Sequence, residues 1–490
     1  MRLPWRNERP VQNQVCNFGA EGAGYQPFQL IIEAFSFDNA TMGSITATAP
    51  CSPIVGKPGT MPGGPFARLA RVVRNRAVMT FVDQGVVSAG NFLTGALLAR
   101  HLSETEYGSY GVILETLLFL NGLQSALVVY PLTVRGASGK SGKAASYATS
   151  ALLFTLALLP LLGSSMAVGA VIGAGAKGPS ASIAIGISAV AAMLLWQIQE
   201  TFRRTLLADF RSGACIPGDA ISYIGQLAAI WWLWKIGHLT LATTLISIGG
   251  TSAAAAIVQA MQIGLEPVTW SKLKACAADF WTLGRWTALT NSFGLVTGVG
   301  YFWTLRVFQG LIATAMFTIV ALPLKLANPV ILALGSLLVP AVSRSFHSGG
   351  LPAARRTALR YAGLGSIVLL PYFLLLVLIP TLPLALIFGR HSPYLSYAPL
   401  LRLYTINMIV YYGEFCLSSW LAGLGESRAN FLAQCFNVLA TLIITLPAGA
   451  VWGARGIILG GIAAGIVSGV AQLGVSFRFM AFTAANAAKE

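Results

Sequence analysis

The stretch YAGLGSIVLLPYFLLLVLIPTLPLALIFG, residues 361–389, decides the fold class of this chain. It contains no Asp, Glu, Lys or Arg, and it is longer than the roughly 20 apolar residues that a helix needs to span a membrane. These residues do not alternate between polar and apolar, so we expect helices and not the strands of a barrel. Further stretches without a charged residue lie at 116–134, 144–176, 178–199, 236–265, 286–305, 429–454 and 456–477.

The composition agrees with this reading. Of the 490 residues 55% are hydrophobic and only 10% are charged, against roughly 25% charged in soluble domains. The chain has no G-x-x-x-x-G-K-[ST] phosphate loop, no C-x-x-C pair and no recognisable hydrolase or transferase motif. We therefore predict a membrane protein that is not an enzyme and has no cofactor or metal, and we leave proton or sodium coupling open.

We predict an all-α integral membrane protein with about twelve transmembrane helices in two parallel six-helix bundles around a central cavity. The expected helices are 78–100, 108–132, 146–172, 180–198, 219–235, 240–263, 286–304, 310–340, 361–387, 397–420, 429–449 and 456–478.

The basic residues indicate the orientation of these helices. Twenty of the 32 Lys and Arg residues fall just before the first helix, at the ends of even-numbered helices or in the loops that follow them. The positive-inside rule then places both termini in the cytoplasm. The net charge of +16 fits contact with anionic lipid headgroups and gives no reason to expect nucleic acid.

The same parse divides the chain into segments. Residues 1–65 mix Gly, Pro, Asn and Ser without a sustained period, and they are either a disordered or a mis-annotated extension. The predicted order is then a basic amphipathic segment at 66–77, an N-terminal bundle at 78–264, a cytoplasmic linker at 265–285, a C-terminal bundle at 286–478 and a cytoplasmic tail at 479–490.

Two short repeats support two halves of the same orientation. YPLTVRGAS after the second helix and VPAVSRSF after the eighth both place an Arg four residues after a Pro, at Arg135 and Arg344. ETFRRTLLA and EFCLSSWLA end the fourth and tenth helices with equal spacing from Glu200 and Glu414. Both matches join helices six apart, so the halves are related by an axis along the membrane normal, as in many transporters.

Four segments carry a family resemblance. FVDQGVVSAGNFLTGALLARHLSETEYGSYG (81–111), ETFRRTLLA, WTLGRW (281–286) and LIFGRHSPYLSYAPLLRLY (386–404) occur in order over roughly 410 residues. This arrangement resembles Wzx-type polysaccharide biosynthesis proteins, which are O-antigen and exopolysaccharide flippases of the multidrug/oligosaccharidyl-lipid/polysaccharide (MOP) superfamily.

The resemblance implies flipping of a lipid-linked oligosaccharide from the inner to the outer leaflet of a bacterial plasma membrane. Its partners are then this substrate, membrane lipids and, as a further expectation, polysaccharide polymerase and glycosyltransferase components. Two alternatives stay open at this point: a cation-coupled multidrug exporter of the same superfamily, and a membrane subunit of a polysaccharide synthase that transports nothing.

Polar residues with helical spacing occur on the first two helices of each half. The resemblance implies that these four helices line the cavity, although interhelical hydrogen bonding would explain the same residues. The cavity candidates are Gln84 and Asn91 in the first helix, Asn121 and Gln124 in the second, Asn291 in the seventh and Asn328 in the eighth.

Charges inside the predicted helices are the sharper candidates because they are costly in a membrane. Lys325 lies near the middle of the eighth helix between Pro323 and Pro329, which should break the helix and leave the lysine to bind a pyrophosphate. Glu115 occupies nearly the equivalent place in the other half, and we expect it to pair with Lys325 when no substrate is bound.

Three further charges complete the candidates. Asp83 and Glu115 are candidates for ion coupling, with a structural role for Asp83 as the alternative. Arg135 and Arg344 lie where an incoming headgroup would enter from the cytoplasm, although the positive-inside rule alone explains their presence.

Overall fold

The computed structural model describes residues 76–137, 144–175, 178–209, 211–425 and 427–487. These residues form helices joined by turns, and no strand occurs among them. The predicted extension 1–65 and the basic segment 66–77 up to residue 75 lie outside the described residues.

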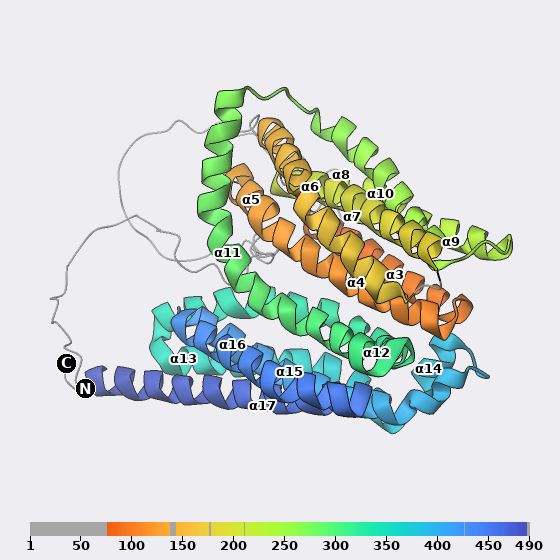
Figure 1. Cartoon of the computed structure of the whole chain (residues 1–490). Helices are drawn as coiled ribbons and strands as arrows, with labels where there is room; N and C mark the ends of the chain where they lie inside the picture. Colours follow the sequence, from red (N-terminus) through yellow and green to blue (C-terminus); the bar gives the residue numbers. More distant parts are fainter. Residues whose placement is uncertain (1–75, 138–143, 176–177, 210, 426, 488–490) are drawn as a thin grey trace, which may run out of the picture.

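The helices form two groups, which are the upper and lower bodies in Figure 1. The N-terminal group consists of α3 (Arg76–His101), α4 (Glu104–Gln124), η2 (Ser125–Val129), α5 (Tyr130–Ala137), α6 (Ala144–Ala174), α7 (Pro179–Ala208), α8 (Ser212–Asp219), η3 (Ala220–Ile224), α9 (Gly225–Lys235) and α10 (Leu241–Ile263).

The C-terminal group begins with α11, which reaches from the first body to the second (Figure 1). The elements are α11 (Trp270–Thr304), η4 (Leu305–Gln309), α12 (Gly310–Leu324), η5 (Lys325–Ala327), α13 (Asn328–Leu378), α14 (Thr381–Phe388), η6 (Pro393–Tyr397), α15 (Ala398–Gly423), α16 (Ser427–Ala440), η7 (Thr441–Thr445) and α17 (Leu446–Ala487).

Two long helices are interrupted at glycines. α13 is broken at Gly349 and Gly350, and α17 at Gly453. Gly350 and Gly453 have φ values of 63° and 61°, which side-chain-bearing residues rarely adopt. After the break in α17, Gly456 packs directly on the carbonyl of Ala448, so the two parts of the helix approach closely.

The fold class predicted from the sequence is confirmed. Six described segments are long and apolar enough to cross a membrane, namely Glu104–Arg135, Tyr147–Ala174, Pro179–Ala208, Leu241–Ile263, Thr297–Leu378 and Asn430–Gly474. Many large apolar side chains, among them Ile187, Ile367 and Val451, lie exposed on the surface, as a lipid-facing surface requires. The described residues thus fold as helical bundles suited to a bilayer.

Part of the predicted linker at 265–285 is helical. α11 begins at Trp270, and its first turns pack on the N-terminal group, where Arg135 pairs with Asp279 and Phe154 contacts Phe280. The predicted tail from residue 479 likewise continues α17 as far as Ala487.

α11 packs along the N-terminal group, and the other elements of the C-terminal group contact that group at one end, which we call the closed end and define by Arg100, Arg306 and Phe388. There α4 packs on α12 and α3 on α14 (right in Figure 1). Buried side chains of both groups, including Tyr107 and Phe317, form one continuous apolar core. At the other end, called the basic end, α5 and α13 lie well apart in Figure 1.

Candidate functional site

The α-helix is interrupted at Lys325, as the flanking prolines predicted. α12 ends at Leu324, a short 3₁₀ turn spans Lys325–Ala327, and α13 starts at Asn328 with Pro329 in its first turn. The Tyr372 hydroxyl donates a 2.6 Å hydrogen bond to the carbonyl of Pro323. The break therefore has a satisfied backbone, while the Lys325 side chain is exposed.

Glu115 lies on α4 near this break. Lys325 is close enough for its charge to act on the Glu115 carboxylate, and that carboxylate in turn acts on Tyr110 and Tyr404. The expected direct pair is nevertheless wrong for this conformation, because the ion pairs within 4 Å in the described residues are those of Arg135, Arg203 and Arg204. The reason is positional: Lys325 points out from the break and Glu115 is half-buried on α4.

The other cavity candidates are scattered. Gln84 and Asn91 are exposed on α3, and Asn121 is half-buried on α4 with its amide oxygen unpaired. Asn328 is exposed and lines a cavity of the C-terminal group. Asn291 lies in α11, but its side chain is outside the described residues.

Gln124 needs a correction. Its amide nitrogen is 3.0 Å from the Thr155 hydroxyl on α6 and 3.2 Å from the Thr201 hydroxyl on α7. The side chain is fully buried between these helices. Gln124 therefore holds helices together by hydrogen bonds, which was the alternative explanation for the polar stripes.

A buried ion network joins three helices of the N-terminal group near the basic end. Arg203 on α7 donates to Asp83 on α3 through Nη2 (2.6 Å) and to Asp219 on α8 through Nε (2.5 Å). Glu200 contacts Arg203 at 3.5 Å and pairs with Arg204 at 2.6 Å. All but Arg204 are buried.

Amide side chains surround the same network. Gln259 on α10 is 3.2 Å from Oδ1 of Asp219, and Gln199 is 3.4 Å from the same atom. Ser222 donates to Gln199 at 2.9 Å. Asp83, a candidate for ion coupling with a structural role as the alternative, is fully buried because α7 and α8 cover it with Arg203 and Asp219.

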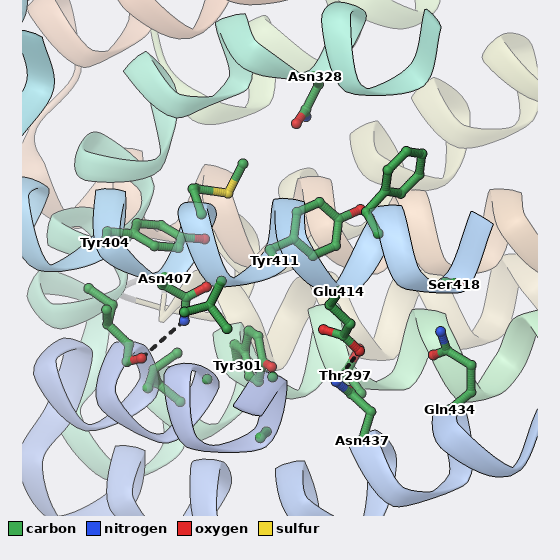
Figure 2. A pocket seen from close by; sticks show the side chains of 18 of the residues that line it. Thr297, Tyr301, Asn328, Tyr404, Asn407, Tyr411, Glu414, Ser418, Gln434 and Asn437 are labelled. Atoms are coloured by element: carbon green, nitrogen blue, oxygen red, sulfur yellow. Dashed lines mark hydrogen bonds between the residues drawn. The ribbon is translucent and has the colours of Figure 1, made fainter. Parts of the chain in front are cut away.

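A second site is a cavity of about 360 Å³ inside the C-terminal group (Figure 2). Side chains from α11, α13, α15, α16 and α17 line it, and many of them bear oxygen. The labelled lining residues in Figure 2 are Thr297, Tyr301, Asn328, Tyr404, Asn407, Tyr411, Glu414, Ser418, Gln434 and Asn437.

Glu414 is the acidic residue of this cavity. Its Oε1 accepts a 3.0 Å hydrogen bond from Asn437 on α16 (Figure 2). Gly465 on α17 lies beside the carboxylate, and a Cβ there would be in ordinary contact with Oε2 at 3.6 Å. No basic side chain of the described residues lies within 4 Å of this carboxylate. A partly buried carboxylate among neutral oxygen donors can hold a proton or a small hard cation.

Sequence reasoning singled out Glu414 only as a repeat of Glu200, and it missed Asp219 entirely. The repeated spacing of the two glutamates was the available signal. Their surroundings differ, because Arg203 and Arg204 follow Glu200 whereas Leu417 and Ser418 follow Glu414 at the same spacing. No group of three or more His, Cys, Asp or Glu arranged to hold a metal ion occurs among the described residues.

The two predicted entry arginines differ in this structure. Arg135 on α5 pairs with Asp279 on α11, so its guanidinium is engaged in joining the two groups. Arg344 on α13 is exposed at the basic end. Of the two, Arg344 is the one whose charge faces the surroundings.

The buried network predicts a large difference between two neighbouring arginines. Arg203→Gln leaves Asp83 and Asp219 buried without their shared guanidinium, which should cost about 3–5 kcal/mol of stability. Arg204→Gln removes a side chain that is 27% exposed and should cost about 1 kcal/mol or less. Thermal unfolding of both variants in the same detergent measures the difference, and equal losses of Tm would contradict the network as drawn.

Comparisons with known proteins identify solved structures that have a similar fold. No family model matches the sequence, and no curated protein matches it. An inward-facing multidrug resistance MATE family transporter of the MOP superfamily superposes with a TM-score of 0.66 at 13% identity, over 82% of this chain and 99% of that one. An outward-facing MATE family transporter of the superfamily gives 0.56 at 14% identity, over 86% and 97%.

A flippase has the same fold. The lipid II flippase MurJ in an inward closed conformation superposes with a TM-score of 0.61 at 12% identity, over 81% of this chain and 87% of that one. These solved neighbours are transporters and flippases. The chain thus has the helical fold of MOP superfamily transporters.

Proposed function

We propose that this protein flips a polyprenyl-pyrophosphate-linked oligosaccharide from the inner to the outer leaflet of a bacterial plasma membrane by alternating access. The observation that carries the proposal is Lys325, an exposed cation on a helix break in the middle of an apolar segment. A sugar headgroup on a pyrophosphate cannot cross about 30 Å of hydrocarbon unaided, since each unsatisfied polar group costs several kcal/mol. A lysine between two helical groups offers that headgroup a charge partner on its path.

The distribution of charge favours an anionic substrate. Asp83 and Asp219 share Arg203, and Glu200 is paired with Arg204, so each of these carboxylates already has a cationic partner. Lys325 makes no ion pair within 4 Å in the part of the chain that the structure describes. At the helix break the exposed charge is therefore that of Lys325, while Glu115 is half-buried nearby.

A groove that suits a lipid tail is lined in part by α4, the helix that carries Glu115. An open groove of about 530 Å³ runs between α4, α6 and α11, and its lining is mostly apolar, with Phe119, Val168 and Trp303 among the residues. Thr116, which accepts a 3.1 Å hydrogen bond from Trp303, also lines it and directly follows Glu115 in sequence. A polyprenyl tail in this groove would keep its contact with lipid while the headgroup meets Lys325.

Glu414 is our choice for the coupling site, in place of Asp83 and Glu115. Asp83 is held by Arg203, and Glu115 lies under the influence of Lys325. Glu414 lies in a cavity with Asn437 as its hydrogen-bond partner and has room for a proton or a sodium ion. Loading of this site in the C-terminal group would drive the change between the two conformations.

A cation-coupled multidrug exporter is the second candidate function. The observation in its favour is the same cavity, whose carboxylate and tyrosines suit an organic cation as well as an inorganic one. Export of a cationic dye such as ethidium by cells expressing the protein distinguishes the two. A flippase leaves the dye content of the cells unchanged.

Lys325→Ala should lower the flipping rate about tenfold or more, because a hydrogen bond to a charged group is worth about 1.5–3 kcal/mol. The measurement is the fraction of fluorescent lipid-linked oligosaccharide that becomes reachable by a membrane-impermeant reagent in proteoliposomes. Lys325→Arg keeps the charge and should retain most of the rate. Lys235→Ala, which removes a lysine stacked near Trp234 at the closed end, is the matched control.

Wild-type rates for Lys325→Ala would overturn the role of this lysine. Absence of flipping by the wild-type protein, with a folded and correctly inserted sample, would overturn the flippase function and favour the exporter or a non-transporting subunit.

Glu414→Gln should abolish the response of flipping to an imposed ion gradient while leaving slow, gradient-independent flipping. The reason is that a neutral amide cannot exchange a proton or balance the charge of a bound sodium ion. Flipping is measured with a pH gradient and, separately, with a sodium gradient. Glu266→Gln, an exposed glutamate between α10 and α11, should respond like wild type. An unchanged gradient response of Glu414→Gln would remove Glu414 from coupling.

A further inference from the structure

Arg100 joins the two groups at the closed end. It is the residue before the last of α3, in the N-terminal group. Its Nε donates to the carbonyl of Ile387 at 2.5 Å and its Nη2 to the carbonyl of Leu386 at 2.9 Å. Both acceptors belong to the last turn of α14, in the C-terminal group.

Arg306 makes the same connection in the reverse direction. It lies in η4 of the C-terminal group. Its Nε donates to the carbonyl of Gly173 at 2.9 Å and its Nη2 to the carbonyl of Ile172 at 3.0 Å. These acceptors belong to the last turn of α6, in the N-terminal group.

The two connections match atom by atom. In each, Nε binds the carbonyl of the next-to-last helical residue, and Nη2 binds the carbonyl of the residue before it. Each arginine precedes the next helix by four residues, at Glu104 and Gly310. Each capped helix is followed by a glycine with positive φ, Gly175 at 58° and Gly389 at 102°. The match follows the repeat of the two halves, so one axis relates both connections.

The physical basis is the end of a helix. The last carbonyls of a helix have no partner within it and carry its partial negative charge. A guanidinium supplies two fixed donors and a full positive charge to such a pair of carbonyls. Each connection is therefore two charge-assisted hydrogen bonds that exist only while the two groups are in contact.

Backbone contact lies between the two connections. Gly108 on α4 packs on the carbonyl of Leu311 and beside Ala315 on α12, and Gly111 packs on the hydroxyl of Thr318. Ala315 is 1% exposed. Side chains at positions 108 and 111 would push the helices apart, so this part of the closed end is tightly packed.

We propose that Arg100 and Arg306 form a symmetric double latch that keeps the closed end shut, and that both must release for the protein to reach its alternate conformation. The proposal rests on alternating access, the mechanism in the proposed function, but not on the identity of the substrate. Because the two arginines are equivalent, their loss should have equal and independent effects on the closed state.

The chain supplies a matched control in Arg402. Its Nε also donates to a helix-end carbonyl, that of Val377 at 2.9 Å, but donor and acceptor both belong to the C-terminal group. Arg402→Gln removes the same chemistry without touching the contact between the groups.

Opening of the closed end is measured as the rate at which a maleimide labels Ala315→Cys in purified protein, in a background that keeps Cys215 and lacks the other native cysteines. Arg100→Gln and Arg306→Gln should each raise this rate about tenfold, and the double variant about a hundredfold, if the two contributions add. Arg402→Gln should leave the rate unchanged. Cys215, which is fully buried in α8, is retained and should stay unlabelled in every variant that is folded.

An unchanged rate in both single variants would overturn the latch, as would a change in only one of them or an equal change in Arg402→Gln. The measurement contains no substrate, so it stands or falls separately from flipping. Loss of flipping with the predicted labelling pattern would leave the latch in place and remove the proposed function.

Discussion

Burying an unpaired charge in apolar surroundings is unfavourable in free energy. The rest of this structure depends on which partner stabilises each charge within the helical groups. Arg203 is buried with Asp83 and Asp219, where each charge has a partner. Arg100 and Arg306 use the carbonyls of helix ends. Lys325, Glu115 and Glu414 have no ion pair within 4 Å among the described residues, and of these we propose Lys325 and Glu414 as the functional residues. A charge left in this state needs water, an ion or a charged ligand, which is what a transport path supplies.

The repeat of the two halves relates the contacts at the closed end, because equivalent helices of each half make them. At the closed end α4 packs on α12, second helix against eighth, and the arginines of the first and seventh helices bind the ends of α14 and α6. The chain superposes better on an inward-facing MATE transporter than on an outward-facing one, with TM-scores of 0.66 and 0.56. With the positive-inside orientation that we propose, the closed end faces away from the cytoplasm, and the site at Lys325 is approached from the inner leaflet.

The sequence predicted those features that depend on the residue types within a single helix. Uncharged stretches predicted the helices, and two prolines predicted the break at Lys325. The polar stripes were less informative, because spacing assigns residues to a face of a helix but does not say what that face contacts. Gln124 lies among Thr155 and Thr201 for this reason, although its spacing was compatible with a cavity wall.

Contacts between distant helices could not be predicted at all. Asp219 on α8 binds Arg203 on α7, and no pattern in the sequence links the two residues. The acceptors of Arg100 and Arg306 are backbone carbonyls, which every residue has, so the sequence carries no sign of them. The repeat did contain the necessary hint for Glu414, but only the cavity around it distinguishes it from Glu200.

The central claim is that Lys325 recognises the phosphate groups of a lipid-linked sugar, and binding tests it most directly. The affinity of the purified protein should be measured for a polyprenyl-pyrophosphate oligosaccharide and for the same glycolipid without phosphates. Our account predicts that the pyrophosphate form binds at least about tenfold more tightly to the wild type, and that Lys325→Ala removes most of this difference. Equal affinities for the two lipids, or a preference that survives Lys325→Ala, would contradict it.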